Sequence, residues 1–186
     1  WGATEWSSDK YKRNIYGTPS DSCGDYAWIQ HMICSMSSGK GRMAVVMPQG
    51  ILFRGNQEAE IRKQLVESDL IEAVVTLGDK LFYGTGLSPC FLIIRRMKQA
   101  HHSGRILMID GSKILTQKRA QNILEENDID RLYSLYQNYS DEEDYSRIVT
   151  LQEIRDKEYN LSPNRYVVYH KEEIRPYAEV LAEFKQ

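Results

Sequence analysis

Residues 81–96 read LFYGTGLSPCFLIIRR, and this segment determines the topology of the predicted sheet. It ends in an apolar run, residues 89–96, with the composition of a buried strand. Only eleven residues, without a helical pattern, separate this run from the preceding apolar run at residues 71–77. Because a parallel return needs a crossover of about a dozen residues or more, the two predicted strands must run antiparallel.

Two further apolar runs extend the predicted sheet. Residues 42–48 and 71–77 flank a helical pattern at 56–68, which predicts a strand-helix-strand unit with parallel strands. Residues 105–112 form a fourth predicted strand, and residues 25–38 form an amphipathic helix before the first. The sequence therefore predicts an α/β fold with a mixed sheet covered by helices on both faces.

The pattern changes after the fourth predicted strand. Residues 128–139 have a helical pattern, and Thr150 and Glu153 have the spacing of a capping box that begins a short helix. The last segment aligns apolar side chains on one helical face, which we expect to dock on the domain or on another subunit. We predict an α/β part, residues 1–112, and a mostly helical extension, residues 113–186.

The charges are distributed unevenly along the chain. The net charge of the 186 residues is -2, but residues 1–120 hold 16 Lys and Arg against 11 Asp and Glu. Residues 121–186 hold 8 against 15. The first part could face a polyanion and the second a protein partner, although solvated surface charge explains the asymmetry nearly as well.

Cysteine usage and hydropathy indicate the compartment. Three cysteines without a CxxC pair argue against a disulfide framework and against a zinc ribbon, so we expect reduced thiols and no metal. The longest apolar runs are far shorter than the roughly 18 residues of a membrane span. We therefore expect a cytoplasmic protein that does not enter a membrane.

Common catalytic signatures are absent from the sequence. It contains no glycine-rich dinucleotide loop, P-loop, nucleophile elbow or zinc-protease helix, and its five isolated prolines form no Asn-Pro-Pro-aromatic motif. Pro48, Gln49 and Gly50 follow the first strand at its carboxyl end, where open α/β sheets bind ligands. They either line a cleft or form a simple turn. Arg54 nearby is either a phosphate contact or a solvated side chain.

Four segments in a fixed order and spacing carry a resemblance to a known family. They are YGTPSDSCGDYAWIQHMI, GRMAVVMPQGILFRGNQEAEIRKQL, IEAVVTLGDKLFYGTGLSPCFLIIRRMK, and ILMIDGS with QNIL. Together, over residues 16–168, they resemble the modification subunit of type I restriction-modification systems, an N-6 adenine DNA methyltransferase. The resemblance implies S-adenosylmethionine as cofactor and, as partners, DNA and the specificity and restriction subunits of the same system.

The resemblance also implies a fold. The family has a Rossmann-like sheet of seven strands, the last antiparallel and inserted between the fifth and the sixth. Residues 42–48, 71–77 and 89–96 would be the fifth, sixth and seventh strands, which agrees with the antiparallel direction inferred from loop length. Residues 1–112 would then be the C-terminal half of the methyltransferase catalytic domain, and residues 113–186 a helical C-terminal arm.

The chain departs from the family in the parts that carry the chemistry. The family places its glycine-rich cofactor loop and its catalytic Asn-Pro-Pro-Phe upstream of a region that resembles residues 1–17, and neither motif is present. The chain also begins with Trp1. We therefore expect a fragment that holds no catalytic and no cofactor-binding residue and is inactive by itself.

The loop before the last strand has an implied role in DNA binding. In related adenine methyltransferases an aromatic residue in this loop packs against the flipped target base, and Phe82 occupies that position, with Tyr83 beside it. Flipping costs a few kcal/mol, and stacking on an aromatic side chain contributes roughly 1–3 kcal/mol per base. Gly84 and Gly86 would let the loop bend toward the substrate. The alternative is that Phe82 closes the end of the core.

Two rival functions remain open. The chain could be a non-catalytic assembly module that binds a specificity subunit, or part of a fused or stand-alone adenine methyltransferase. The predicted strand at residues 42–48 would also present a long apolar edge, which invites pairing with another chain. We expect either a dimer through this edge or an edge covered by residues 1–20.

Overall fold

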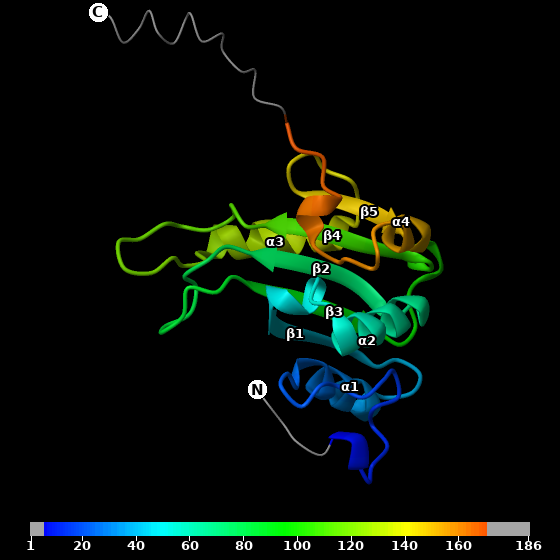
Figure 1. Cartoon of the computed structure of the whole chain (residues 1–186). Coiled ribbons are helices and arrows are strands. Elements are labelled where there is room, and N and C mark those ends of the chain that lie inside the picture. Colours follow the sequence, from blue (N-terminus) through cyan, green and yellow to red (C-terminus); the bar gives the residue numbers. More distant parts are fainter. Residues whose placement is uncertain (1–5, 171–186) are drawn as a thin grey trace, which may run out of the picture.

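The computed structural model describes residues 6–170, which form a five-stranded sheet with helices on both faces (Figure 1). The strand order across the sheet is β1-β3-β2-β4-β5. The strands are Arg42–Pro48 (β1), Ile71–Leu77 (β2), Pro89–Arg95 (β3), Arg105–Gly111 (β4) and Ser146–Thr150 (β5). The α-helices are Asp25–Ser35 (α1), Asn56–Glu67 (α2), Glu126–Asn138 (α3) and Leu151–Asp156 (α4).

Strand β3 runs antiparallel to both of its neighbours. It pairs with β1 from Arg42↔Arg95 to Pro48↔Pro89, and it pairs with β2 on its other side. Strands β2 and β4 are parallel, and β4 and β5 are antiparallel. The mixed sheet and the antiparallel return are thus confirmed. Strands β1 and β2 share a direction, as the strand-helix-strand unit predicts, but β3 lies between them.

Both faces of β2 are covered, so the strand is buried along its whole length. Its side chains alternate between two cores. Val74 packs in the core that contains Ile61 of α2 and Ile154 of α4, whereas Val75 packs in the core that contains Leu135 of α3. Figure 1 shows α2 and α3 on opposite sides of the sheet. Burial on both sides explains why β2 is a continuous apolar run rather than an alternating one.

Strand β5 departs from the expected helical character of residues 113–186. Its sequence, SRIVT, offers only Ile148 and Val149 as apolar residues, and the strand forms by antiparallel pairing with β4. Such pairing overrides a weak local pattern. The division of the chain at residue 112 stays a prediction, with the sheet now continuing beyond it.

The predicted helices within the described residues are confirmed. Helix α3 matches the pattern at 128–139 within two residues, and α4 begins with the expected capping box. In that box the Oγ1 of Thr150 accepts from the N–H of Glu153 at 3.3 Å, while the Oε2 of Glu153 accepts from the N–H of Thr150 at 2.9 Å. The apolar stripe of the last segment lies outside the described residues. Within residues 6–170, no helix has the length and apolarity needed to cross a membrane.

The segment before α1 packs on that helix. The side chain of Gln30 accepts from the N–H of Tyr16 at 2.8 Å and donates to the carbonyl of Gly17 at 2.9 Å. Gly17 has a φ of +134°, and a Cβ there would lie 3.0 Å from Cγ1 of Ile61, so glycine is needed. Residues 6–20 form no backbone hydrogen bond to β1, and to this extent the expected cover of the edge is not found.

One edge of β1 therefore stays unpaired in the described part of the chain. The carbonyl of Gly41 accepts from the N–H of Arg96 at 2.8 Å, and the N–H of Gln49 donates to the carbonyl of Ser88 at 3.4 Å. Because backbone groups alternate along an antiparallel strand, the odd-numbered positions of β1 face β3. The even-numbered positions direct their N–H and C=O groups to the open edge: Arg42, Ala44 and Val46.

We propose that two copies of the chain pair through this edge, and we predict that Ala44→Pro weakens the dimer. Proline removes an outward N–H but is tolerated on an edge strand. In a symmetric pair two hydrogen bonds are lost, worth about 1 kcal/mol each. Sedimentation velocity over a concentration series measures the change, with Ala44→Ser as the control that keeps the N–H. A chain that is monomeric at every concentration would contradict the proposal.

Candidate functional site

Three strands meet at one end of the sheet, where β1 and β2 end and β3 begins. We call this place the Phe82 edge, which is distinct from the unpaired side of β1. Gln49, directly after β1, links all three strands. Its N–H donates to the carbonyl of Ser88, and its side-chain Nε2 donates to the carbonyls of Leu77 at 3.2 Å and Pro89 at 3.4 Å. Pro48 pairs with Pro89 across the ladder. Gln49 therefore fixes the shape of this edge through hydrogen bonds within the protein.

Phe82 stands between two cavities at this edge. One, of about 190 Å³, is lined by Phe82 and Pro48, and the other, of about 290 Å³, is lined by Phe82 and Phe91. The side chain of Phe82 is 49% exposed. Tyr83 is 92% exposed and lines neither cavity. The structure therefore brings two of the predicted site residues together, Pro48 and Phe82, and separates Tyr83 from them.

The QNIL segment, residues 121–124, holds the loop before β3 through hydrogen bonds to the backbone of that loop. The N–H of Asn122 donates to the carbonyl of Lys80 at 3.0 Å, and its Nδ2 donates to the carbonyl of Asp79 at 3.1 Å. Nε2 of Gln121 donates to the carbonyl of Leu81 at 3.0 Å. All four residues of the segment also line the larger cavity. Sequence patterns assign it no role, because its partners lie about 40 residues earlier in the chain.

We predict that Asn122→Ala loosens this loop without unfolding the protein. Asn122 is buried, and its Nδ2 also reaches Oδ1 of Asp79 at 3.2 Å. Loss of these bonds costs about 1–3 kcal/mol locally. Hydrogen exchange measured by mass spectrometry should become faster for the peptide that carries residues 79–83. Gln117→Ala, an exposed amide in the same connection, is the matched control. Equal exchange in both variants would refute the bracing role.

Arg54 is held by two carboxylates. It forms ion pairs with Asp25 at the start of α1 and with Glu58 in the first turn of α2. Its Nη2 donates to Oε1 of Glu58 at 3.1 Å. The hydrogen bonds to Glu58, and then those to Asp25, raise the pKa of Arg54. A Cβ on Gly50 would lie 2.6 Å from Nη1 of Arg54, so this glycine belongs to the same cluster. A phosphate contact of Arg54 stays a prediction and would compete with two existing partners.

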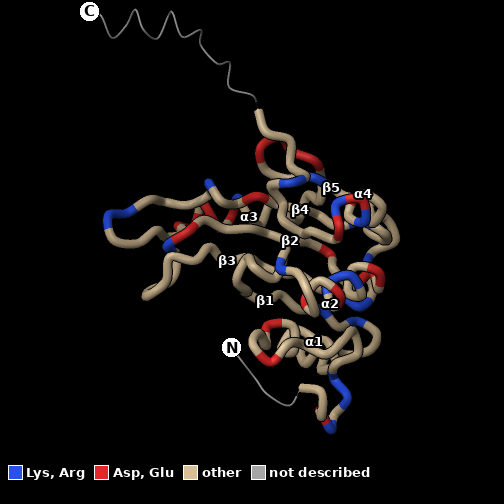
Figure 2. The backbone as a smooth tube through the Cα atoms, in the orientation of Figure 1, with Lys and Arg blue, Asp and Glu red and all other residues tan. Residues whose placement is uncertain are grey.

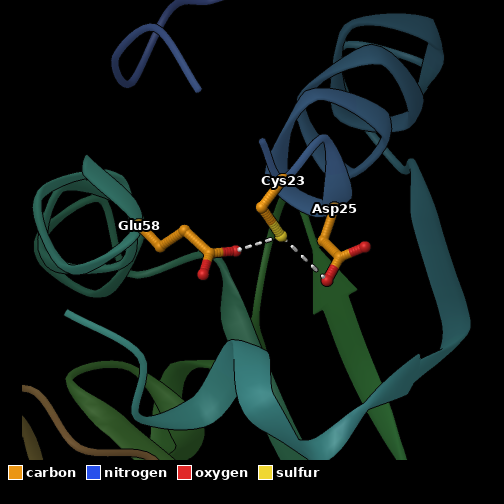
Figure 3. A group of neighbouring side chains, drawn as sticks. All are labelled: Cys23, Asp25 and Glu58. Carbon is orange, nitrogen blue, oxygen red and sulfur yellow. Dashed lines mark hydrogen bonds between the residues drawn. The ribbon is translucent and has the colours of Figure 1, made fainter. Parts of the chain in front are cut away.

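Cys23 completes the cluster (Figure 3). Its Sγ lies 3.3 Å from Oε1 of Glu58 and 3.5 Å from Oδ2 of Asp25. Burial raises the pKa of this thiol, which therefore stays protonated and donates to the carboxylates. Three such side chains within reach of one another could also hold a metal ion. Because the guanidinium of Arg54 already pairs with both carboxylates, the geometry fits a hydrogen-bonded cluster instead.

We predict that Arg54→Ala lowers the free energy of unfolding by about 2 kcal/mol. The variant leaves two carboxylates side by side, one of them the buried Glu58, without a positive partner. The estimate is modest because the Arg54 side chain is 36% exposed and solvent screens the pair. Urea unfolding at pH 7 measures the loss, with the exposed Arg42→Ala as control. Equal stability of the two variants would mean that the ion pairs contribute nothing.

Two loops project from the same end of the sheet (Figures 1 and 2). One is the loop of Phe82, before β3. The other, between β4 and α3, carries Lys113, Lys118 and Arg119, and Figure 2 shows basic residues at its tip. Lys118 forms an ion pair with Glu125 at 3.2 Å. This end of the molecule therefore combines an aromatic side chain with cations, the two kinds of group that bind nucleic acid strands.

The fold is that of the Rossmann-like methyltransferases. A solved structure with the same arrangement is a type I restriction-modification methyltransferase subunit from Streptococcus thermophilus. It is 29% identical, with a TM-score of 0.78, over 89% of this chain and 35% of the other. The model of the N-6 DNA methylase family matches residues 1–174. The chain therefore belongs to the N-6 DNA methylase family.

Several named relatives of this chain are methylase subunits of type I restriction enzymes. The MjaVII methylase subunit from Methanocaldococcus jannaschii is 36% identical over 202 residues, which cover 100% of this chain and 34% of the relative. The HindI methylase subunit from Haemophilus influenzae is 31% identical over 163 residues, which cover 83% of this chain and 36% of the relative. The chain thus spans about a third of the length of these relatives.

Proposed function

We propose that this chain is the C-terminal part of the modification subunit of a type I restriction-modification system. The whole subunit transfers the methyl group of S-adenosylmethionine to the exocyclic amine of adenine in DNA. The chain by itself is inactive, because the glycine-rich cofactor loop and the catalytic Asn-Pro-Pro-Phe of the family are not in its sequence. Family membership supports this proposal. So does the share of its relatives' length that the chain spans, which is about one third.

The position of Phe82 is the single observation that supports a role in binding the target base. A half-exposed ring between two cavities offers an aromatic face to a planar ligand. Stacking of a flipped adenine on this face contributes roughly 1–3 kcal/mol, which offsets much of the cost of flipping. Pro48, which lines one of the cavities, forms part of the wall. Gln49 and the QNIL segment position the loop through their hydrogen bonds.

S-adenosylmethionine supplies the methyl group when bound. The described residues offer no glycine-rich loop after a strand for it, so we place its binding site in a part of the subunit outside this chain. The contribution of this chain is to shape the wall of the cleft, to hold Phe82 at the edge of the sheet and to exclude water from the base.

The proposed partners are DNA and the specificity and restriction subunits, and the proposed compartment is the cytoplasm. The loop that carries Lys118 and Arg119 would contact the DNA backbone beside the Phe82 loop. The excess of acidic residues in 121–186 favours a second candidate function, a non-catalytic module that binds the specificity subunit. A third possibility is that the chain is part of a fused or stand-alone adenine methyltransferase. The sequence on either side of this segment in the intact gene distinguishes it from the modification subunit and from the assembly module.

Calorimetric titration with S-adenosylmethionine tests the proposed division of the subunit. We expect no binding heat with this chain and saturable heat with a longer polypeptide from the same gene that includes the upstream sequence. The reason is that the cofactor site lies in the upstream part. Micromolar binding by this chain alone would contradict both the placement of the cofactor and the assignment of the strands.

We predict that Phe82→Ala in the intact subunit, assembled with its specificity subunit, lowers kcat/KM for methyl transfer to DNA by about tenfold. Loss of one stacking contact of roughly 1–3 kcal/mol accounts for a change of this size. Transfer of tritiated methyl groups measures it. Phe82→Trp should retain the activity, and Tyr83→Ala should change it less than about twofold because that ring lines neither cavity. Equal losses for Phe82→Ala and Tyr83→Ala would contradict the assignment.

A further inference from the structure

A polar cavity of about 620 Å³ lies between α2 and the segment that follows α4. Its volume is typical of ligand pockets, which span roughly 300–1,000 Å³. The Phe82 cavities are mainly apolar, whereas the walls of this one carry charged and amide side chains. The side chains that matter for the argument are Arg62, Lys157, Glu158, Asn160, Asn164 and Arg165.

Arg62 is a buried cation without an anionic partner among the described residues. It is only 2% exposed. Its Nε donates to the carbonyl of Tyr159 at 2.8 Å, and its Nη1 donates to the carbonyls of Arg54 at 2.8 Å and Ile51 at 3.3 Å. The nearby Glu58 is already paired with Arg54. Because neutral carbonyls only partly compensate a buried charge, an anion in the cavity would find a positive potential ready to receive it.

The two walls of the cavity are fixed to one another. The N–H of Leu161 donates to the carbonyl of Leu52 at 2.9 Å, beside the bond between Arg62 and Tyr159. Lys157 is held at the wall as well. Its Nζ donates to the backbone carbonyl of Arg165 and lies 4.2 Å from the centroid of the Tyr166 ring. A ligand would therefore enter a preorganised site, which lowers the entropic cost of binding.

We propose that this cavity binds a phosphate group. The lining of the cavity includes three cations, Arg62, Lys157 and Arg165, but only one carboxylate, that of Glu158. Arg165 is exposed at the mouth, where its planar guanidinium can donate two parallel hydrogen bonds to a phosphate. Asn160 and Asn164 add amide donors. This site is separate from the Phe82 edge and does not depend on the proposed methyltransferase function.

Phe53 indicates where the phosphate comes from. It lines the same cavity and its side chain is 54% exposed. An exposed aromatic ring beside a cluster of cations suits a nucleotide, because the base stacks on the ring while the phosphate meets the cations. The ligand is therefore a phosphate carried by a nucleotide, either free or within a DNA strand.

The experiment is a titration of the ¹⁵N-labelled chain with sodium phosphate at constant ionic strength, followed by amide chemical shifts. We expect saturable shifts at residues 157–165. Arg165→Gln should weaken phosphate binding about threefold, and Glu158→Gln should strengthen it by a similar factor, because the two substitutions change the local charge in opposite directions. Arg42→Gln, which removes an exposed arginine at the far end of β1, should change nothing.

Parallel titrations with adenosine monophosphate and with a short single-stranded DNA oligonucleotide distinguish the two sources. Tighter binding of the mononucleotide than of inorganic phosphate and of the oligonucleotide assigns the site to a free nucleotide. Tighter binding of the oligonucleotide, with shifts at the same amides that are again sensitive to Arg165→Gln, assigns it to a DNA strand. Shifts spread evenly over all surface cations, equal effects of Arg165→Gln and Arg42→Gln, or equally tight binding of acetate would each overturn the proposal.

Discussion

The connection of eleven residues between β2 and β3 sets both the topology of the sheet and the position of the Phe82 loop. It is too short for a crossover, so β3 must return antiparallel, and it enters the sheet between β1 and β2. Strand β3 then begins at the edge where β1 and β2 end. The loop is therefore confined to the carboxyl end of the sheet, and Gln49 can bond to the ends of all three strands at once. A longer connection with a helix would have moved Phe82 away from this edge.

Two arginines that lie eight residues apart differ in whether their charge is neutralised within the protein or remains available to a ligand. Arg54 lies just before α2 and Arg62 lies in the middle of that helix, and both make several hydrogen bonds. The carboxylates of Asp25 and Glu58 neutralise Arg54, so its charge is used within the protein. Arg62 meets only neutral oxygens and lies deeper in the protein. Arg54, the arginine that the sequence suggests as a phosphate contact, is thus already paired with carboxylates of the protein. The uncompensated charge belongs to Arg62, which a helical pattern would assign to the surface.

The sequence predicts β1 to β4 almost to the residue, because strands covered on both faces are continuous apolar runs bounded by turns. The family resemblance and the loop-length argument agree on the antiparallel strand for independent reasons. Prediction from the sequence fails where contacts between distant segments determine the local structure. Strand β5 is five residues long with two apolar side chains, and it exists because β4 offers an unpaired edge. The partners of Asn122, and Asp25 as one of the two partners of Arg54, come from distant segments, so spacing along the chain carries no signal of them.

The bracing of the loop bears on the two interpretations of Phe82. If its ring closed the end of the core, it would need to cover the side chains of Leu77 and Phe91. The QNIL segment lines the cavity next to both of these residues, and Leu77 is only 3% exposed while Phe82 remains half exposed. Residues other than Phe82 therefore also contribute to closing this end of the core. An aromatic ring that remains half exposed loses hydrophobic stabilisation, and contact with a ligand is the direct way to recover it.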